Sequence, residues 1–234
     1  LREGHLIPIC FVSAASGVGI GDLLEVFARH LPHPGEGNPP LFYKGEGEAA
    51  EEYRAVPDPA RHAIAHVFKI KNDPFVGRMG IFRVYQGTVA RDSQLFAGDG
   101  RRPFKVGHLY RLQGREHVEI DRALPGDIAA ISRVEDLAFD TVLHDSHDED
   151  HIHMRPLEFP QPMFGLAVQA KRRCDEQKIA EALQRIASED PTFLVEQDGS
   201  THETVIRGLG ELHLRAVLDR LAQVYHVEVE TRPP

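Results

Sequence analysis

Histidine and carboxylate side chains, which can act as metal ligands, gather in one stretch of this sequence. They are His144, Asp145, His147, Asp148, Glu149, Asp150, His151 and His153. Imidazole and carboxylate groups both bind zinc. The spacing matches no closed zinc motif, however, and the surrounding residues are polar, as in a solvated connecting segment. We therefore expect no metal site in this stretch.

A second group of residues could bind phosphate. Between residues 71 and 115 the sequence has nine lysines and arginines against three acidic residues, although the whole chain carries a net charge of -9. A basic segment within an acidic protein can meet RNA phosphates locally. Scattered arginines on a solvated sheet surface would give the same pattern, so both interpretations stay open. The candidate RNA or ribosome contacts are Arg78, Arg83, Arg101, Arg102 and Lys105.

No phosphate-binding loop of the form Gly-x-x-x-x-Gly-Lys-Ser/Thr occurs in the 234 residues. The chain by itself therefore lacks the usual means of holding nucleotide phosphates and Mg²⁺. Its 41% apolar and 27% charged residues are typical of a folded soluble protein. No apolar run approaches the roughly 20 residues that span a bilayer. Cys10 and Cys174 lie far apart in apolar or helical contexts, which favours reduced, buried thiols and a cytoplasmic protein and leaves a disulfide as the alternative.

The first part of the chain predicts one strand and one helix. Residues 7–12 are almost entirely apolar, as expected of a strand that is buried on both faces. Apolar residues then follow at helical spacing from Ile20 to Leu31, and Pro32 ends the pattern. One strand and one helix cannot form a core alone. We therefore expect residues 1–33 to be the last βα unit of a larger α/β domain.

The remaining chain divides into four segments. Residues 34–60 and 146–162 have little apolar content and are interpreted as linkers. Residues 61–145 show short apolar runs broken by turn signals, such as Gly-Asp-Gly at 98–100, and predict a small β-barrel. Residues 163–234 carry strand and helix signals in the order βαββαβ, which predicts a ferredoxin-like domain. The expected fold class is therefore multi-domain α+β.

Two long motifs resemble the elongation factor G family of translational GTPases. Residues 68–78, Phe-Lys-Ile-Lys-Asn-Asp-Pro-Phe-Val-Gly-Arg, are similar to the opening strands of that family's domain II. Residues 188–193, Ser-Glu-Asp-Pro-Thr-Phe, and 208–214, Gly-Leu-Gly-Glu-Leu-His-Leu, are similar to its domain III. A short Val-Ser-Ala at residues 12–14 resembles the guanine-contacting motif that ends the family's GTPase domain.

The resemblance implies an internal fragment with the end of domain I, β-barrel domain II and ferredoxin-like domain III. It implies that Ser13 and Ala14 contact guanine in the complete protein, and that GTP and Mg²⁺ are bound there and not by this fragment. The implied partner is the ribosome, through small-subunit RNA and ribosomal proteins. We expect a monomer that binds neither DNA nor membranes.

Glycines before the second helix of the last domain would let another domain approach closely, because they lack a Cβ. A tight turn with a helix cap would account for the same residues, and the two interpretations are compatible. The candidates for coupling between domains are Gly208, Gly210, Glu211 and His213.

Some residues depart from the translocating members of the family. Examples are Gln113-Gly114-Arg115, the His-rich segment near Asp145, and Phe139, where the family usually has Gly. These differences favour an elongation-factor-G-like paralogue. Within the superfamily, a ribosome-protection or ribosome-recycling GTPase is an alternative. Alternatives of another class are a metal-responsive His-rich protein and a module whose ferredoxin-like domain holds a small effector.

Overall fold

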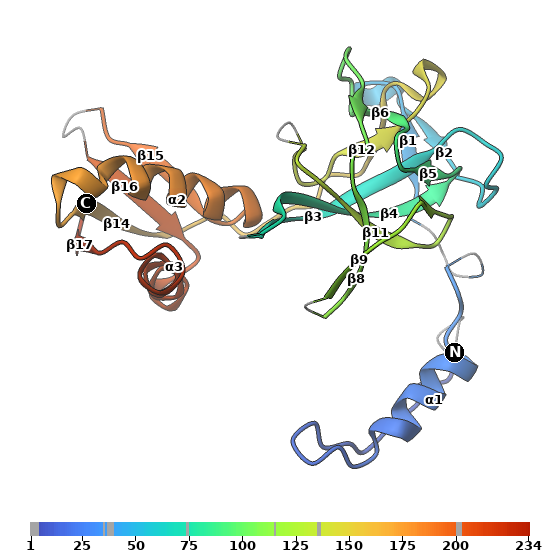
Figure 1. Cartoon of the computed structure of the whole chain (residues 1–234), viewed down its shortest axis with the longest axis horizontal. Helices are drawn as coiled ribbons and strands as arrows, with labels where there is room; N and C mark the ends of the chain where they lie inside the picture. Colours follow the sequence, from blue (N-terminus) through green and yellow to red (C-terminus); the bar gives the residue numbers. More distant parts are fainter. Residues whose placement is uncertain are drawn as a thin grey trace.

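The computed structural model describes residues 5–34, 36, 40–73, 75–114, 116–134, 137–199 and 203–234. Three parts follow one another along the chain (Figure 1): a helix near the N-terminus, a curled β-domain and an α/β domain that ends at the C-terminus. Pro74 and Arg115, which belong to motifs noted above, lie outside the described residues. None of the helices in the described part has the length and apolar character needed to span a bilayer.

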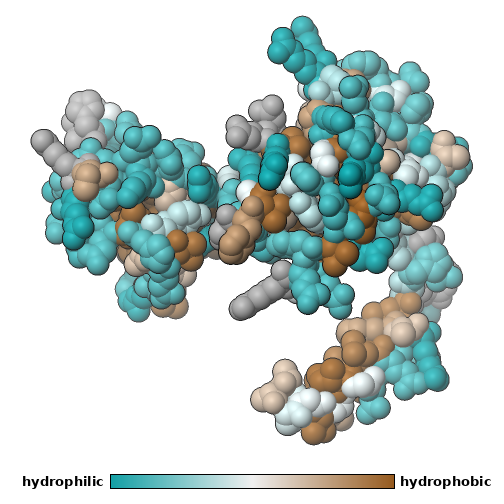
Figure 2. Space-filling model, viewed as in Figure 1, coloured by the Kyte–Doolittle hydropathy of each residue, from teal (hydrophilic) through white to brown (hydrophobic). Residues whose placement is uncertain are grey.

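The N-terminal part is an extended segment followed by helix α1 (Ile20–His30). The strand predicted at residues 7–12 is absent: these residues pair with no strand among the described residues, and Phe11 is 92% exposed. Their apolar composition is that of a buried strand, but a strand needs neighbours to satisfy its N–H and C=O groups. Helix α1 also has no buried residue, and apolar side chains lie along one side of it (Figure 2).

The central domain is a curled antiparallel sheet, as the sequence predicted. Eight strands pair in the order β7-β6-β12-β3-β4-β11-β8-β9, and β10 pairs with β5. The strands are β3 (Ile64–Asp73), β4 (Gly77–Gln86), β5 (Val89–Ala90), β6 (Gln94–Ala97), β7 (Phe104–Lys105), β8 (Leu109–Gln113), β9 (Glu116–Glu119), β10 (Arg122–Ala123), β11 (Ile128–Ser132) and β12 (Val142–His144). The register of β3 against β4 shifts between Val67 and Lys69, and such a bulge bends the strands and helps the sheet to curl.

The barrel encloses an apolar core, because alternate side chains of each strand point inward. Val67, Phe82, Val84, Leu109 and Leu143 are completely buried in it. Burying one side chain of this size contributes roughly 1.5–3 kcal/mol. The core therefore fixes the strands, and the strands fix the positions of the surface turns that carry charged residues.

Both segments interpreted as linkers contain strands, which corrects that interpretation. β1 (Phe42–Lys44), β2 (Glu51–Tyr53) and β13 (Ile152–Met154) form a three-stranded antiparallel sheet in the order β13-β1-β2. Phe42 is completely buried and packs with Ile64 of β3. The short 3-10 helices are η1 (Gly47–Ala49), η2 (His147–Glu149) and η3 (Arg173–Asp175). The small sheet therefore belongs to the barrel domain.

The C-terminal domain has the predicted order βαββαβ. Its elements are β14 (Phe164–Ala170), α2 (Glu176–Glu189), β15 (Leu194–Gln197), β16 (Thr204–Gly208), α3 (Glu211–Gln223) and β17 (Val229–Arg232). The strands are antiparallel in the order β15-β16-β14-β17. Ile179 of α2 and Leu214 of α3 share one core with Ile206 of β16, so both helices cover the same face. The predicted ferredoxin-like arrangement is confirmed.

Candidate functional site

Two arginines stand exposed at the turn between β6 and β7. This turn begins with Gly98, whose φ of 53° lies in the left-handed region, and Gly100 N–H donates to the Ala97 carbonyl oxygen at 3.1 Å. Arg101 and Arg102 follow it and are both exposed. Within the part of the chain that the structure describes, neither side chain makes an ion pair or hydrogen bond. Both guanidinium groups are therefore available for an anionic partner.

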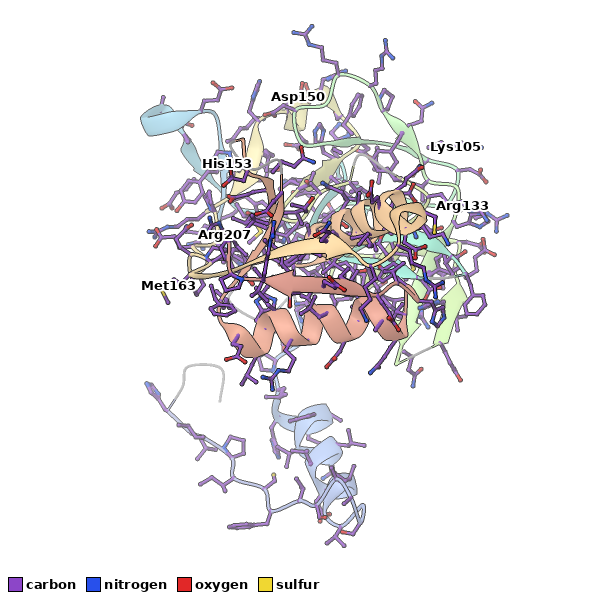
Figure 3. All side chains as sticks on the ribbon, turned by 90° about the vertical axis from the view of Figure 1, so that its left-hand side faces the viewer. Lys105, Arg133, Asp150, His153, Met163 and Arg207 are labelled. Carbon is purple, nitrogen blue, oxygen red and sulfur yellow. The ribbon has the colours of Figure 1, made fainter. Side chains whose placement is uncertain are left out.

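The third cation predicted at this turn is already paired. Lys105 Nζ lies 2.7 Å from Asp92 Oδ1, because the antiparallel pairing of β6 and β7 brings the start of β6 beside β7. The hydrogen bond and the charge of Lys105 hold the pKa of the Asp92 carboxyl below its ordinary value. Lys105 lies at the periphery of the molecule (Figure 3). Its charge is offset locally, so it attracts phosphate less than Arg101 and Arg102 do.

Arg78 and Arg83 lie on β4 and are only half exposed. Arg78 Nη2 donates to the Leu137 carbonyl oxygen at 2.6 Å, so this guanidinium holds the segment that follows β11. Arg83 lies opposite His66 of β3 in the sheet register and forms no ion pair among the described residues. The structure thus gives Arg78 an internal partner and leaves Arg83 with partial access to solvent.

Ser13 and Ala14 lie in a tight turn before α1. Ser13 N–H donates to the Val18 carbonyl oxygen at 3.0 Å, and the Ser13 carbonyl oxygen accepts from Gly17 N–H at 2.8 Å. The Ser13 hydroxyl oxygen accepts from Ser16 N–H at 3.3 Å. The backbone of Ser13 is therefore occupied within the turn. Of the two predicted guanine contacts, the exposed Ala14 is the one whose N–H has no partner among the described residues.

The two glycines of the predicted coupling segment have different environments. A Cβ on Gly208, at the end of β16, would lie 2.8 Å from Leu214 Cδ2 and 2.9 Å from His213 Nδ1. Gly208 is therefore needed for packing inside the domain. A Cβ on Gly210 would meet no atom within 4 Å, and its φ of -178° is extended backbone open to any residue. Nothing inside the described chain requires glycine at position 210.

His213 connects the start of α3 to the end of α2. Its Nδ1 accepts from Leu209 N–H at 3.2 Å, and this requires the proton to be on Nε2. Nε2 lies 3.1 Å from Asp190 Oδ2, and the other Asp190 oxygen accepts from Thr192 N–H at 2.8 Å. We call His213 and Asp190 the clasp. It joins the start of α3 to the residue that follows α2, so the contacts of His213 are internal to the domain.

The surface around Gly210 carries one acidic residue and two exposed apolar side chains. Glu211 lies in the first turn of α3, where the helix dipole favours a negative charge, and pairs with Arg215 at 2.7 Å. Leu212 is 75% exposed and Met163 is 85% exposed. Met163 precedes β14, and its N–H donates to the Gly208 carbonyl oxygen, which places it at the same end of the domain (Figure 3).

The histidine-rich stretch is occupied by internal contacts. His144 is buried, and its two ring nitrogens lie 2.8 Å from the Ser146 carbonyl oxygen and 2.9 Å from the Gly98 carbonyl oxygen. His147 Nδ1 lies 3.0 Å from Asp150 Oδ2. No three metal-binding side chains converge on one point within the described residues.

One contact between the two domains was not foreseen. Asn72 of β3 hydrogen bonds to Glu189 at the end of α2, and Glu189 also pairs with Arg220 of α3. Asn72 and Glu189 both lie inside the motifs that carry the family resemblance. The only sign of this contact in the sequence was that each residue belongs to one of the two motifs. The sequence alone does not show that the two motifs are in contact.

Comparisons with known proteins assign both domains. A family model described as elongation factor G domain 2 matches residues 62–145, and one described as elongation factor G, domain III matches residues 159–233. The crystal structure of a protein from Thermus thermophilus is similar, with 30% sequence identity and a TM-score of 0.69. The similarity covers 92% of this chain and 29% of that protein, so the chain spans less than a third of the length of its relative.

The curled β-domain followed by a ferredoxin-like domain is the arrangement of domains II and III in elongation factor G. The chain belongs to the elongation factor G family, and the resemblance seen in its motifs is confirmed.

Proposed function

We propose that this chain provides the ribosome-docking and interdomain-coupling part of a GTP-dependent, ribosome-binding translation factor. The main supporting observation is a pair of arginines, Arg101 and Arg102, at a turn that the barrel core holds in place. Neither arginine has a side-chain partner among the described residues. Rigidly placed cations neutralise RNA phosphates at little cost in ordering. Small-subunit RNA is therefore the proposed partner of this turn, with ribosomal proteins beside it.

The coupling role rests on the segment around Gly210. A glycine that the domain itself does not require, beside exposed Leu212, leaves room for a second domain to pack closely. In the complete protein we propose that this second domain is the GTPase domain, which binds GTP and Mg²⁺ and hydrolyses GTP. Ala14 would then contribute its free N–H to guanine. A cytoplasmic monomer belongs to the same proposal.

Replacing Arg101 and Arg102 by Ala should weaken ribosome binding of the complete protein. Two lost phosphate contacts should lower the slope of log affinity against log salt by about 1–2, since each contact contributes roughly 0.7–0.9. Co-sedimentation with small subunits across a salt series measures this slope. Lys105→Ala should change it little, because Asp92 already offsets that charge.

The matched control removes two cations that are already paired. Lys171 pairs with Glu228 at 2.9 Å and Lys178 lies 3.7 Å from Asp175, both in the ferredoxin-like domain. Lys171→Ala/Lys178→Ala changes the net charge equally. A salt slope that falls as much in this control as in the arginine variant would show that overall charge, and not the β6–β7 turn, drives binding.

The chain alone should not bind GTP. Its sequence has no phosphate-binding loop, so no backbone cradle or lysine is present for the β- and γ-phosphates. Isothermal titration calorimetry of residues 1–234 with GTP and Mg²⁺ should give no heat of binding at micromolar concentrations. Micromolar affinity would contradict the assignment of nucleotide binding to another part of the protein.

A further inference from the structure

The contact between the barrel and the ferredoxin-like domain centres on Asn72. This residue lies near the end of β3, against the last turn of α2, and its backbone N–H donates to Glu189 Oε1 at 2.5 Å. Its side-chain Nδ2 lies 3.0 Å from the same oxygen, 3.1 Å from the Arg185 carbonyl oxygen and 3.2 Å from Ser188 Oγ. The two N–H bonds of one side-chain amide group thus lie within hydrogen-bond distance of three acceptors at the end of one helix.

The two donors of Asn72 stabilise the charge of Glu189. Its carboxylate is only 12% exposed and lies at the negative end of the α2 dipole, where a negative charge is unfavourable. A carboxylate largely removed from water needs hydrogen-bond donors or a cation. Arg220 of α3 supplies the cation, with Nη2 2.5 Å from Glu189 Oε2. Asn72 supplies both donors to the other oxygen, so the barrel completes a charged site that the ferredoxin-like domain leaves half satisfied.

The surroundings of this contact are open to solvent and carry several charged side chains. A cleft of about 430 Å³ lies beside it, lined by residues that include Lys69, Lys71 and Pro191. Phe75, at the turn between β3 and β4, is 93% exposed, so the large apolar side chain closest in sequence does not seal the interface. Small polar interfaces between domains permit relative motion. Hydrogen bonds to Asn72 join β3 to α2 directly, so they contribute to the orientation of the two domains.

We propose that Asn72, Glu189 and Arg220 form an interdomain latch, with Asn72 as the residue that positions the ferredoxin-like domain on the barrel. When the latch is closed, the domain has one orientation. When it is broken, the domain rotates as a rigid body while both cores stay intact. This inference goes beyond the proposed function, because it concerns the chain by itself and needs neither ribosome nor nucleotide.

Asn72→Asp tests the latch with almost no change in size. The substitution replaces the Nδ2 donor by an oxygen that faces the Glu189 carboxylate, so attraction becomes repulsion. Spin labels on the exposed Cys174 and on an exposed barrel position, Pro103→Cys, report the interdomain distance in a Cys10→Ser background. The unsubstituted latch should give one narrow distance distribution, and Asn72→Asp should make it about twofold broader, as expected when a second state is populated.

A rescue and a control separate the latch from a general loss of structure. Adding Glu189→Gln to Asn72→Asp removes the second negative charge, while the side-chain carbonyl oxygen of the new amide can still accept the backbone N–H of residue 72, and should restore the narrow distribution. Gln94→Glu makes the same kind of amide-to-acid change on the exposed start of β6, and should leave the distribution unchanged. If Asn72→Asp melts early, Asn72→Ala replaces it with the same expected direction. A distribution that stays narrow in a folded Asn72 variant would overturn the latch.

Discussion

The Gly210→Val variant is expected to melt only slightly below the wild-type chain, because Gly210 is the N-cap of α3 and valine caps less well, yet to lose most ribosome-stimulated GTP hydrolysis in the complete protein. A Cβ at this position meets nothing within 4 Å and the backbone is extended, so the domain accommodates valine without strain. A partner domain packed against Gly210 would be held away by the isopropyl group. Small displacements of groups that must be aligned lower the reaction rate strongly, so we expect the rate of GTP hydrolysis to fall roughly tenfold or more.

Gly208→Ala provides the matched control two residues earlier. Its methyl group would lie 2.8 Å from Leu214 Cδ2, and Leu214 is completely buried. Overpacking of this kind costs roughly 1–3 kcal/mol, which at about 4–8 °C per kcal/mol lowers the melting temperature of a small domain by roughly 10 °C. Thermal melts of the chain, with hydrogen exchange in α3, measure this cost. GTP hydrolysis at the wild-type rate in Gly210→Val would remove this segment from the coupling mechanism.

The φ angle of Gly210 removes one explanation for a glycine at this position. A left-handed backbone would require glycine, because a side chain would strain it. The observed φ of -178° excludes that explanation, and close approach of a partner and the N-cap position of α3 remain compatible with this angle. Backbone angles follow from how the β16–α3 connection is closed in three dimensions, and residue types alone do not report them.

The two folded domains were predictable because their apolar residues alternate with the correct period. Ile179, Leu183 and Ile186 share one face of α2 and enter a single core, as helical spacing requires. The βαββαβ order followed from a series of such segments. The barrel was equally visible, since its short strands are separated by turn residues such as those at 98–100.

The sequence-based predictions were wrong for segments whose structure depends on distant strands. Residues 7–12 have the composition of a buried strand, but no strand in the described chain pairs with them. Phe42 lies in a segment rich in Pro, Gly and Glu and is nevertheless completely buried, because β1 pairs with β13 and Phe42 packs with Ile64 and Ile152. Strands of three residues carry too few positions for a period to be recognised. The presence or absence of a distant pairing strand therefore decides whether a segment forms a strand, whatever its local composition.

The candidate site shows the same dependence on distant partners. Composition placed Arg78 and Lys105 among the RNA contacts, but each has an internal partner, the Leu137 carbonyl oxygen and Asp92 respectively. Arg101 and Arg102 kept the predicted exposure. The Asn72–Glu189 contact joins residues 117 positions apart, so no local pattern could reveal it.

The clasp of His213 and Asp190 should be the largest single contribution to domain stability among the predicted coupling residues. His213→Ala removes both hydrogen bonds and the edge contact of the imidazole with Phe193, whose ring centroid lies 6.3 Å away. At about 0.5–1.5 kcal/mol per hydrogen bond, plus the unsatisfied partners left behind, the expected loss is roughly 2–3 kcal/mol. The melting temperature should fall by roughly 10–20 °C.

A double-mutant cycle shows whether the interaction between His213 and Asp190 is the cause of this loss of stability. His213→Ala, Asp190→Ala and the double variant should give a coupling free energy of about 0.5–3 kcal/mol, as for side chains in direct contact. His213→Gln is the conservative comparison, because its amide offers one acceptor and one donor, and it should recover part of the stability. Additive losses would mean that the two side chains act independently. If folded His213→Ala in the complete protein still hydrolyses GTP normally at low temperature, His213 supports the domain and takes no part in the coupling.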